Sequence, residues 1–347
     1  MRTAPAAQTF VYDGRRFLRV ERLEADGPDA PFLVPVAIID RYDVGAILAV
    51  GEQTVLLNAT DRRTRRPVVV KTLRSDVFHP IPTGPDRDAI LLDAVRRVRH
   101  GLQTERRLLV RLRNLGLGSV ANPNDYVFDL NPAWLGVLPI ELATTEPYLI
   151  LEHRAGRTLE AMIREECPRG IEERRALTIL RPAIDVLAAL HEPWRRKSGR
   201  TWHCLYLDFK PANLLIDRFD RPTLLDFGGC QVVVDGVPVL EGACTEGYAA
   251  PESLDGPRRV LLPCADVYSV GATLRHMLTG TVPRERLRRQ EDRGREPGGM
   301  RLDLRSLPQS ISPALRDLLA RCLAPRPSDR IADARALTRA FDAILAR

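Results

Sequence analysis

Residues 206–213 read Tyr-Leu-Asp-Phe-Lys-Pro-Ala-Asn, and residues 226–228 read Asp-Phe-Gly. Each stretch lies beside a short apolar run that is typical of a buried strand, LLI at 214–216 and TLL at 223–225. The carboxylate and amide oxygens in these stretches suit Mg²⁺, which prefers oxygen ligands. Asp-Phe-Gly alone is a weak signal in a turn. The two stretches together, with their first aspartates 18 positions apart, argue against a chance match.

These stretches resemble the catalytic loop and the metal-binding turn of eukaryotic-type protein kinases, and the resemblance covers about residues 42–346. It implies transfer of the γ-phosphoryl group of ATP to Ser or Thr hydroxyls of proteins, with Mg²⁺ as the metal. Such transfer depends on positioning and on charge neutralisation. By resemblance, Asp208 orients the acceptor hydroxyl, Lys210 neutralises the transferred group, and Asn213 and Asp226 hold Mg²⁺. The Arg-rich composition is similar to that of bacterial members.

The resemblance also predicts a buried Lys–Glu pair upstream. The apolar run VVV ends at Lys71, which would hold the α- and β-phosphates of ATP. Glu105 is the single Glu between this strand and the end of the next predicted helix, and Leu109 and Leu112 follow it at helical spacing. A lone Glu on a helix is usually solvated, but its uniqueness and register favour pairing with Lys71. We expect residues 75–90 to form an inserted loop or short helix.

The phosphate-binding loop departs from the family pattern GxGxxGxV. The corresponding residues, 49–56, read AVGEQTVL, and only the central glycine, Gly51, is present. Backbone N–H groups of such a hairpin can still face phosphate oxygens. We therefore expect a stiffer loop that still binds ATP.

An adenine pocket is implied by the resemblance as well. Apolar side chains would enclose the base, and the segment after the buried strand at 147–153 would offer backbone hydrogen bonds. The predicted set is Leu56 and Val69 for the roof, Leu215 for the floor, Leu151 as the gatekeeper, and Glu152 to Arg154 as the hinge.

Three further segments resemble structural parts of the family. Residues 245–252, TEGYAAPE, are similar to the end of the activation segment, and Arg330 is expected to pair with the Glu of this stretch. Asp266 resembles the helix residue that holds the catalytic loop. Lys210 and Thr245 together favour Ser or Thr over Tyr as the acceptor. Small-molecule kinases that share the catalytic loop usually lack these parts.

Two departures concern regulation. Leu207 stands where most members have an Arg that pairs with a phosphate on the activation loop. The corresponding loop here, residues 229–244, contains no Ser, Thr or Tyr. The phosphate receptor and the phosphorylation site are therefore absent together, which predicts a kinase that is not switched by activation-loop phosphorylation. An extra piece, residues 192–204, precedes the catalytic loop, and its His203 is interpreted as a structural or surface residue.

The chain is expected to be an α+β protein with the two-lobed, protein-kinase-like fold. A β-rich N-lobe at about 42–152 and a mostly helical C-lobe at about 153–347 would make up a kinase domain of residues 42–347. Residues 1–41 are interpreted as an extension with a β-hairpin around an Asp-Gly pair. Helices are expected over 86–113, 158–166, 172–192, 264–279, 312–324 and 332–346.

Composition narrows the remaining classes. The net charge of +7 is spread over the chain among acidic residues, so nucleic-acid binding is not expected. The six cysteines form no CxxC pair, which favours reduced thiols in the cytoplasm. No stretch approaches the roughly 18 apolar residues of a membrane span, and the N-terminus lacks a secretory apolar region, so no membrane partner is expected.

Three functions stay open, with an active kinase favoured because all six catalytic and metal-binding residues are present. A pseudokinase or nucleotide-gated scaffold is suggested by the glycine-poor loop, Val69 and Leu207. A small-molecule phosphotransferase is the third, and residues 210–211, 245–252 and Arg330 argue against it. The partners expected for the active enzyme are a protein substrate and a regulatory partner.

Overall fold

The computed structural model describes residues 8–12, 15–20, 32–51, 54–73, 84–129, 146–195, 201–234, 237–238, 245, 247–254, 260–283, 304 and 306–347. The chain divides into two compact units, Met1–Val110 with Ala121–His153, and Arg111–Val120 with Arg154–Arg347. Among the helices of the described residues, none is both long and apolar enough to cross a membrane.

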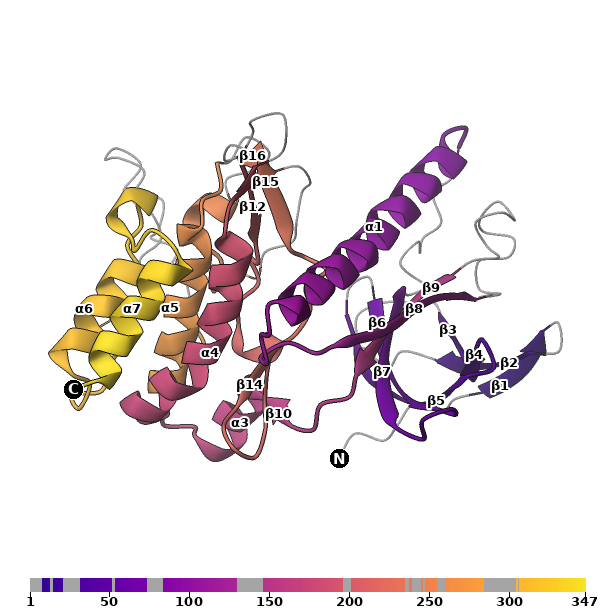
Figure 1. Cartoon of the computed structure of the whole chain (residues 1–347), viewed down its shortest axis with the longest axis horizontal. Coiled ribbons are helices and arrows are strands. Elements are labelled where there is room, and N and C mark those ends of the chain that lie inside the picture. The colour runs from indigo at the N-terminus through magenta and orange to yellow at the C-terminus, as the bar shows by residue number, and fades with distance from the viewer. Residues whose placement is uncertain are drawn as a thin grey trace. The chain divides into compact units, whose positions relative to one another are not determined.

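The first unit is built on a six-stranded antiparallel sheet with the strand order β4-β5-β6-β7-β9-β8 (Figure 1). β-branched and apolar residues dominate the central strands, and these residues fit the pleated, half-buried surface of a sheet. The strands are β4 (Ala37–Ile38), β5 (Tyr42–Val50), β6 (Thr54–Asp61), β7 (Pro67–Leu73), β8 (Pro123–Asp129) and β9 (Glu146–Glu152).

A second, three-stranded sheet precedes it, with β2 between β1 and β3. β1 (Gln8–Tyr12) and β2 (Arg15–Val20) pair antiparallel, with Tyr12 opposite Arg15. The Asp-Gly pair at residues 13–14 lies outside the described residues. β3 (Phe32–Pro35) pairs with β2 and leads to β4.

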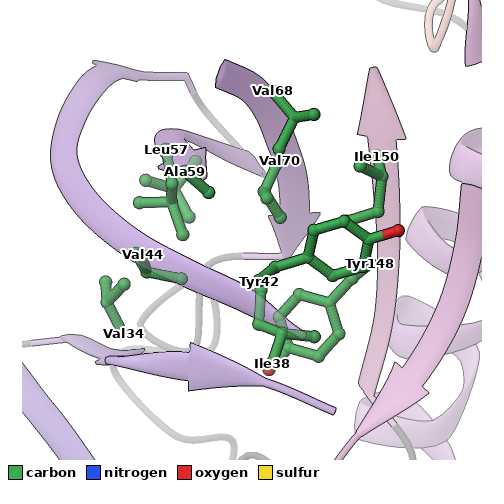
Figure 2. Packing of buried hydrophobic residues seen from close by; sticks show 11 residues of the cluster. Val34, Ile38, Tyr42, Val44, Leu57, Ala59, Val68, Val70, Tyr148 and Ile150 are labelled. Atoms are coloured by element: carbon green, nitrogen blue, oxygen red, sulfur yellow. The ribbon is translucent and has the colours of Figure 1, made fainter. Parts of the chain in front are cut away.

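One face of the large sheet forms the core of this unit. Successive side chains of a strand point to opposite faces, so alternate residues of β6 and β7 turn inward. Val34 and Leu18 pack against this core from the small sheet. Val55 belongs to this core. Figure 2 shows the other core side chains gathered in a common interior: Val34, Ile38, Tyr42, Val44, Leu57, Ala59, Val68, Val70, Tyr148 and Ile150. Burying each Val, Leu or Ile contributes about 1.5–3 kcal/mol.

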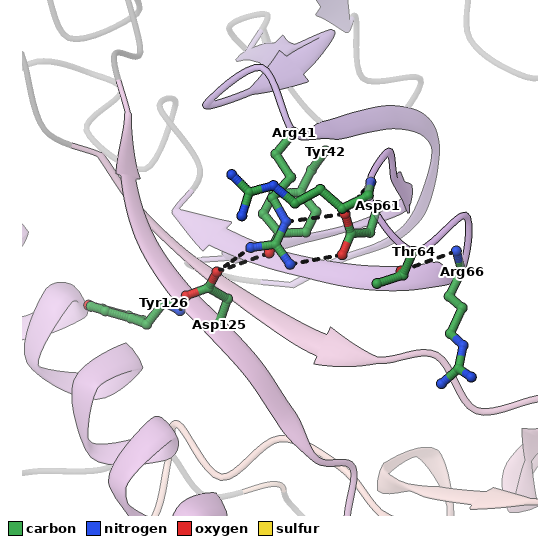
Figure 3. Close-up of polar contacts among 8 residues, drawn as sticks. Arg41, Tyr42, Asp61, Thr64, Arg66, Asp125 and Tyr126 are labelled. Carbon is green, nitrogen blue, oxygen red and sulfur yellow. Dashed lines mark hydrogen bonds and ion pairs between the residues drawn. The ribbon is translucent and has the colours of Figure 1, made fainter.

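Polar contacts join the two sides of the curled sheet (Figure 3). Arg41 forms a two-pronged ion pair with Asp61 and also donates to Asp125 on β8, at 3.1 Å. The Tyr42 hydroxyl donates to the same Asp125 carboxylate at 3.0 Å. Hydrogen bonds from the Arg41 guanidinium lower the pKa of Asp61 to about 2. β5 is next to one edge of the sheet and β8 forms the other edge. The contact of Tyr42 on β5 with Asp125 on β8 therefore holds the sheet in its curved shape.

The helix predicted over residues 86–113 is confirmed as α1 (Arg87–Asn114). Its buried positions include Leu102, Leu108, Leu109 and Leu112, which recur at helical spacing. Of the predicted insertion, residues 75–83 lie outside the described residues, and residues 87–90 belong to the first turn of α1.

The second unit is mostly helical. α5 is its central helix, because every residue from Cys264 to Met277 is buried, and α4 packs against both α5 and α7. Gly280 ends α5 with a φ of 66°, and a Cβ atom there would meet the Pro168 carbonyl oxygen at 2.2 Å. The helices are α3 (Leu159–Glu166), α4 (Glu173–His191), α5 (Cys264–Thr279), α6 (Pro313–Cys322) and α7 (Ala334–Leu345).

Two small antiparallel sheets complete the second unit, with the orders β10-β13-β14 and β11-β12-β15-β16. An Arg-rich stretch, residues 284–299, lies outside the described residues. The strands are β10 (Arg157–Thr158), β11 (Trp194–Arg195), β12 (Thr201–Leu205), β13 (Leu214–Ile216), β14 (Pro222–Leu224), β15 (Gln231–Val234) and β16 (Val237–Pro238). Short 3₁₀ turns lie at η3 (Pro211–Asn213), η4 (Pro251–Leu254) and η6 (Pro327–Asp329).

Candidate active site

Lys71 and Glu105 form a buried ion pair in the first unit. Lys71 Nζ lies 2.8 Å from Glu105 Oε2, and the two side chains are 4% and 2% exposed. Lys71 lies on β7 and Glu105 lies on α1, and the two residues are 34 positions apart in sequence. Removing one member of such a pair leaves an uncompensated buried charge, at a cost of about 3–5 kcal/mol. Pairing therefore fixes the ammonium group on one face of the sheet.

The strand register places three predicted nucleotide-binding residues on the same face as Lys71. Leu56 lies opposite Lys71, and Val69, two positions earlier on β7, lies opposite Leu151. Since side chains two positions apart share a face, all four side chains point away from the apolar core. Leu56 and Val69 are half-buried, as a surface that receives a ligand requires. Gly51 directly follows β5 and donates its backbone N–H to the carbonyl oxygen of Thr54, the first residue of β6, at 2.8 Å.

The side chains of the predicted hinge are already engaged. In the first unit, Glu152 accepts hydrogen bonds from the backbone and side-chain nitrogens of Asn122, at 3.2 and 2.9 Å. In the second unit, Arg154 Nη1 donates to Gly118 O at 2.6 Å. The Glu152 backbone N–H donates as well, to Asn122 O at 2.8 Å. Leu215, the predicted floor residue, is half-buried on β13.

The Asp208 carboxylate lies at the centre of a hydrogen-bonded cluster in the second unit. Its Oδ1 accepts from the Thr245 hydroxyl at 2.6 Å. Its Oδ2 accepts from Asn213 Nδ2 at 2.7 Å and lies 2.8 Å from Lys210 Nζ. Lys210 Nζ also donates to Thr245 Oγ1 at 2.6 Å. The carboxylate is thus held in one orientation by three different side chains while it stays partly exposed.

The donor set around Asn213 and Asp226 fits Mg²⁺. The Asn213 amide nitrogen is bound to Asp208, so the amide oxygen is the atom of this side chain that can ligate a cation. Asp226 is exposed, has a φ of 53°, and its Oδ1 accepts from Gly228 N at 3.2 Å. Leu225 N donates to Asn213 O at 2.9 Å and connects the two segments. One carboxylate and one amide oxygen suit a metal that takes its remaining ligands from phosphates and water.

The Asp266 side chain holds the catalytic loop by accepting hydrogen bonds from backbone N–H groups of that loop. This fully buried carboxylate accepts from Tyr206 N at 2.9 Å and from Leu207 N at 2.6 Å, as the resemblance predicts. His191 Nε2 lies 2.8 Å from the same carboxylate, and Ala334 N donates to His191 Nδ1. The sequence analysis assigned no role to His191. The signal that could have indicated one is its position in the last turn of the helix that precedes the catalytic loop.

Tyr206 connects the catalytic loop to the metal-binding turn. Its ring meets Phe227 edge to face, with the centroids 5.4 Å apart. Its hydroxyl also donates to the Leu225 carbonyl oxygen, directly before Asp226, a contact that the sequence did not predict. Leu207 is buried and has a φ of 63°.

The predicted pair between Arg330 and Glu252 is confirmed. Two guanidinium nitrogens of Arg330 lie 2.6 and 2.8 Å from the two carboxylate oxygens, and the Arg330 side chain is 0% exposed. Backbone carbonyls of Ala324 and Pro325 accept further hydrogen bonds from the same guanidinium. The Tyr268 ring lies under it at 5.0 Å.

The chain belongs to the protein kinase family, because the family model described as "Protein kinase domain" matches residues 137–341. Its curated relatives include Ser/Thr protein kinase PknB of Mycolicibacterium smegmatis, 28% identical over 254 residues, which are 72% of this chain and 34% of PknB. A probable Ser/Thr protein kinase of Corynebacterium efficiens, CE0033, is 26% identical over 253 residues, 72% of this chain and 32% of the relative. The chain thus spans about a third of the length of these relatives, and the predicted resemblance to bacterial Ser/Thr kinases is confirmed.

A solved structure described as "PpkA-294 apo form" has a related fold. It superposes with a TM-score of 0.59 over 88% of this chain and 97% of its own chain, at 18% sequence identity. This match and the family model confirm the predicted α+β protein kinase fold.

Proposed function

We propose that this chain is an ATP- and Mg²⁺-dependent protein kinase that phosphorylates Ser or Thr hydroxyls of protein substrates. The observation that carries the proposal is the cluster in which Thr245, Lys210 and Asn213 hold the Asp208 carboxylate. A carboxylate held in this way can orient an acceptor hydroxyl and receive its proton. The names of the curated bacterial relatives agree with this activity.

The proposed roles follow from the chemistry of each group. Asp208 orients the hydroxyl for in-line attack, and Lys210 neutralises charge on the γ-phosphoryl group as it is transferred. Lys71, held by Glu105, binds the α- and β-phosphates. Asn213 and Asp226 would hold Mg²⁺, which supplies charge neutralisation between the phosphates when bound.

The nucleotide site follows from the same proposal. Leu56 and Val69 cover the adenine, Leu151 is the gatekeeper, and Leu215 is the floor. Glu152 and Arg154 bind through backbone groups, and the Gly51 hairpin covers the phosphates.

We further propose residues 42–347 as the kinase domain and residues 1–41 as an extension. The protein would act in the cytoplasm on protein substrates and under the control of a regulatory partner. Control by a partner is favoured because the loop of residues 229–244 offers no hydroxyl for phosphorylation.

A nucleotide-gated scaffold is the second candidate. It is favoured by the phosphate-binding hairpin, in which Ala49 and Thr54 stand at the two outer glycine positions of the family pattern. Side chains there keep the backbone farther from the phosphates, which would weaken ATP binding or slow transfer.

Phosphate incorporation from γ-labelled ATP tests the proposal. Wild type is compared with Asp208→Asn and Lys71→Met, with a generic basic protein as acceptor. Asp93→Asn, at an exposed carboxylate that pairs with Arg97 on α1, is the matched control. We expect label with wild type and Asp93→Asn, and a loss of about a thousandfold or more in the other two. Unlabelled wild type that still gains thermal stability from ATP would favour the scaffold instead.

A further inference from the structure

The outer face of α1 carries positive side chains that have no role in the proposed mechanism. From residue 94 to residue 110, this helix contains five arginines and one histidine, and Glu105 is the single carboxylate of that stretch. Glu105 is buried against Lys71, so it does not balance the arginines. Five of the six side chains are exposed, namely Arg96, Arg97, His100, Arg106 and Arg107. This part of the surface therefore attracts negative charge.

Helix geometry places these side chains away from the Lys71–Glu105 pair. With about 3.6 residues per turn, Arg107 lies roughly 200° around the helix from Glu105. Arg96 and His100 precede Arg107 by eleven and seven positions, which puts the three on one face. That face extends over about 16 Å at a rise of about 1.5 Å per residue. A partner bound there does not compete with a nucleotide for Lys71.

Most of this charge has no counter-charge among the described residues. Arg97 pairs with Asp93 at 2.9 Å, and the two side chains are 66% and 63% exposed. The Arg106 guanidinium lies over the Tyr126 ring at 5.4 Å, a contact that orients it without neutralising its charge. The side chains of Arg96 and Arg107 form no ion pair with any residue that the structure describes. Three guanidinium groups can therefore still pair with carboxylates of another molecule.

An exposed aromatic side chain adjoins the arginines. Tyr126, the ring under Arg106, meets Phe128 edge to face on β8, with the centroids 5.3 Å apart. Phe128 is 51% exposed. Arginine and aromatic side chains are enriched in protein–protein interfaces, where they often carry most of the binding energy. The arginine–aromatic surface comprises Arg96, Arg97, Arg106, Arg107, Tyr126 and Phe128.

We propose that the arginine–aromatic surface docks a partner protein through an acidic segment that carries an apolar side chain. Carboxylates of the segment pair with Arg96, Arg106 and Arg107, and its apolar side chain covers Phe128. A nucleic acid fits this surface less well, because its phosphates would also meet the Asp93 carboxylate. The inference goes beyond the proposed kinase function and does not depend on catalysis.

Binding of a fluorescent peptide tests the surface. The probe is a short peptide in which glutamates surround a central phenylalanine, and its anisotropy with the full chain at low salt gives a Kd. Arg96→Gln, Arg106→Gln and Arg107→Gln together should weaken binding by about tenfold or more, since each of them removes one ion pair. Phe128→Ser should weaken binding by about fivefold, because it removes the apolar contact. A wild-type protein that does not bind the peptide would overturn the proposal.

The matched control removes three exposed arginines from the turn between β6 and β7. Arg63→Gln, Arg65→Gln and Arg66→Gln together change the net charge by the same amount as the first triple variant. This control should leave the Kd within about twofold of wild type, because salt screens charges that lie far from the bound peptide. Equal losses in the two triple variants would overturn the proposal, since they would show attraction by net charge alone.

A charge exchange tests the chemistry of the partner. Arg96→Glu with Arg107→Glu should reject the glutamate peptide and bind a matching peptide that has lysine in place of glutamate. Single-stranded RNA of the same charge is the competing probe, and on wild type it should bind more weakly than the glutamate peptide. RNA that binds more tightly, and loses this affinity in the arginine variants, would overturn the assignment to a protein. The substituted side chains are exposed, and thermal unfolding checks that each variant keeps the wild-type Tm.

The docking surface and the proposed kinase function fail independently. Asp208→Asn should lose phosphoryl transfer and keep the wild-type Kd for the peptide, because docking needs no ATP. An active kinase that does not bind the peptide would contradict only the docking surface. Peptide binding by a wild-type protein without phosphoryl transfer would contradict only the kinase function.

Discussion

The Thr245 hydroxyl shows how much one side chain organises in this site. It donates to Asp208 and accepts from Lys210, although it is 37 residues from the former and 35 from the latter. A hydroxyl can donate and accept at the same time, so it can hold a carboxylate and an ammonium group together. Neither a carboxylate nor an amine at this position could serve both neighbours.

Tyr206 is the residue whose hydroxyl can be removed most selectively. Tyr206→Phe keeps the ring contact with Phe227 and leaves the Leu225 carbonyl without the donated hydrogen bond. Losing a buried hydrogen bond of this kind costs about 1–3 kcal/mol. Because Leu225 precedes Asp226, we expect a several-fold weaker response to Mg²⁺ and about a tenfold lower kcat.

Titrating phosphoryl-transfer activity against Mg²⁺ at saturating ATP checks this expectation. Tyr126→Phe, which removes a hydroxyl from β8 in the other unit, is the control. An unchanged Mg²⁺ response in Tyr206→Phe would mean that the hydroxyl does not position the metal-binding turn.

Among the elements, β7 illustrates how register creates a site. Val68 and Val70 point into the core, and Val69 and Lys71 point to the opposite face. A shift of the pairing by one residue would bury the ammonium among apolar side chains and expose the valines. The apolar pattern of the strand therefore decides which face carries the Lys71–Glu105 pair.

The ion pair between Glu252 on η4 and Arg330, directly after η6, supports a prediction on the stability of the protein. Arg330→Met leaves the Glu252 carboxylate, which is 13% exposed, without its partner. Breaking a buried ion pair in this way costs about 3–5 kcal/mol. We expect a clear fall in the Tm of the protein, and no full rescue by Arg330→Lys, because an ammonium cannot form the two-pronged contact.

Arg335→Met is the matched control for that prediction. Arg335 pairs with Glu192 at a similar distance of 2.6 Å, but both side chains are at least half exposed. Exposed pairs contribute about 0–1 kcal/mol. Equal effects of the two substitutions on Tm, measured by thermal unfolding, would contradict the importance assigned to burial at Arg330.

At the scale of the whole molecule, the buried His276 makes folding depend on pH. Burial lowers the pKa of His276 to about 4, from 6.5 in an exposed side chain, and its Nδ1 lies 2.7 Å from the Tyr248 hydroxyl. Between these pH values the unfolded chain takes up a proton that the folded chain does not. The free energy of unfolding should therefore be highest above pH 6.5 and fall toward pH 4, by on the order of 3 kcal/mol from this group.

Urea unfolding at a series of pH values measures this slope. His276→Gln, which cannot be protonated, should give a flatter profile between pH 6.5 and 4 than wild type. His100→Gln, at an exposed position on α1, should leave the profile unchanged. The expectation is wrong if His276→Gln keeps the wild-type slope.

Much of the kinase fold could be predicted because its signals are local. The spacing of apolar residues predicted α1 and the C-terminal helices, and the pair of motifs around Asp208 and Asp226 indicated the family. The hydrogen bond from Tyr206 to Leu225 and the contact of His191 with Asp266 were not predicted. Both join segments that are distant in sequence, and no periodicity within either segment reports on the other.

The identities of the chemical groups were determined by the sequence alone, since a carboxylate, an ammonium and an amide keep their chemistry wherever the chain places them. The tertiary structure decided which of them meet. Folding brought Asp125 to Arg41 across 84 residues, and the piece before the catalytic loop to the activation loop. Such meetings depend on the packing of whole strands and helices, because the cost of closing long loops is recovered only through many contacts made together.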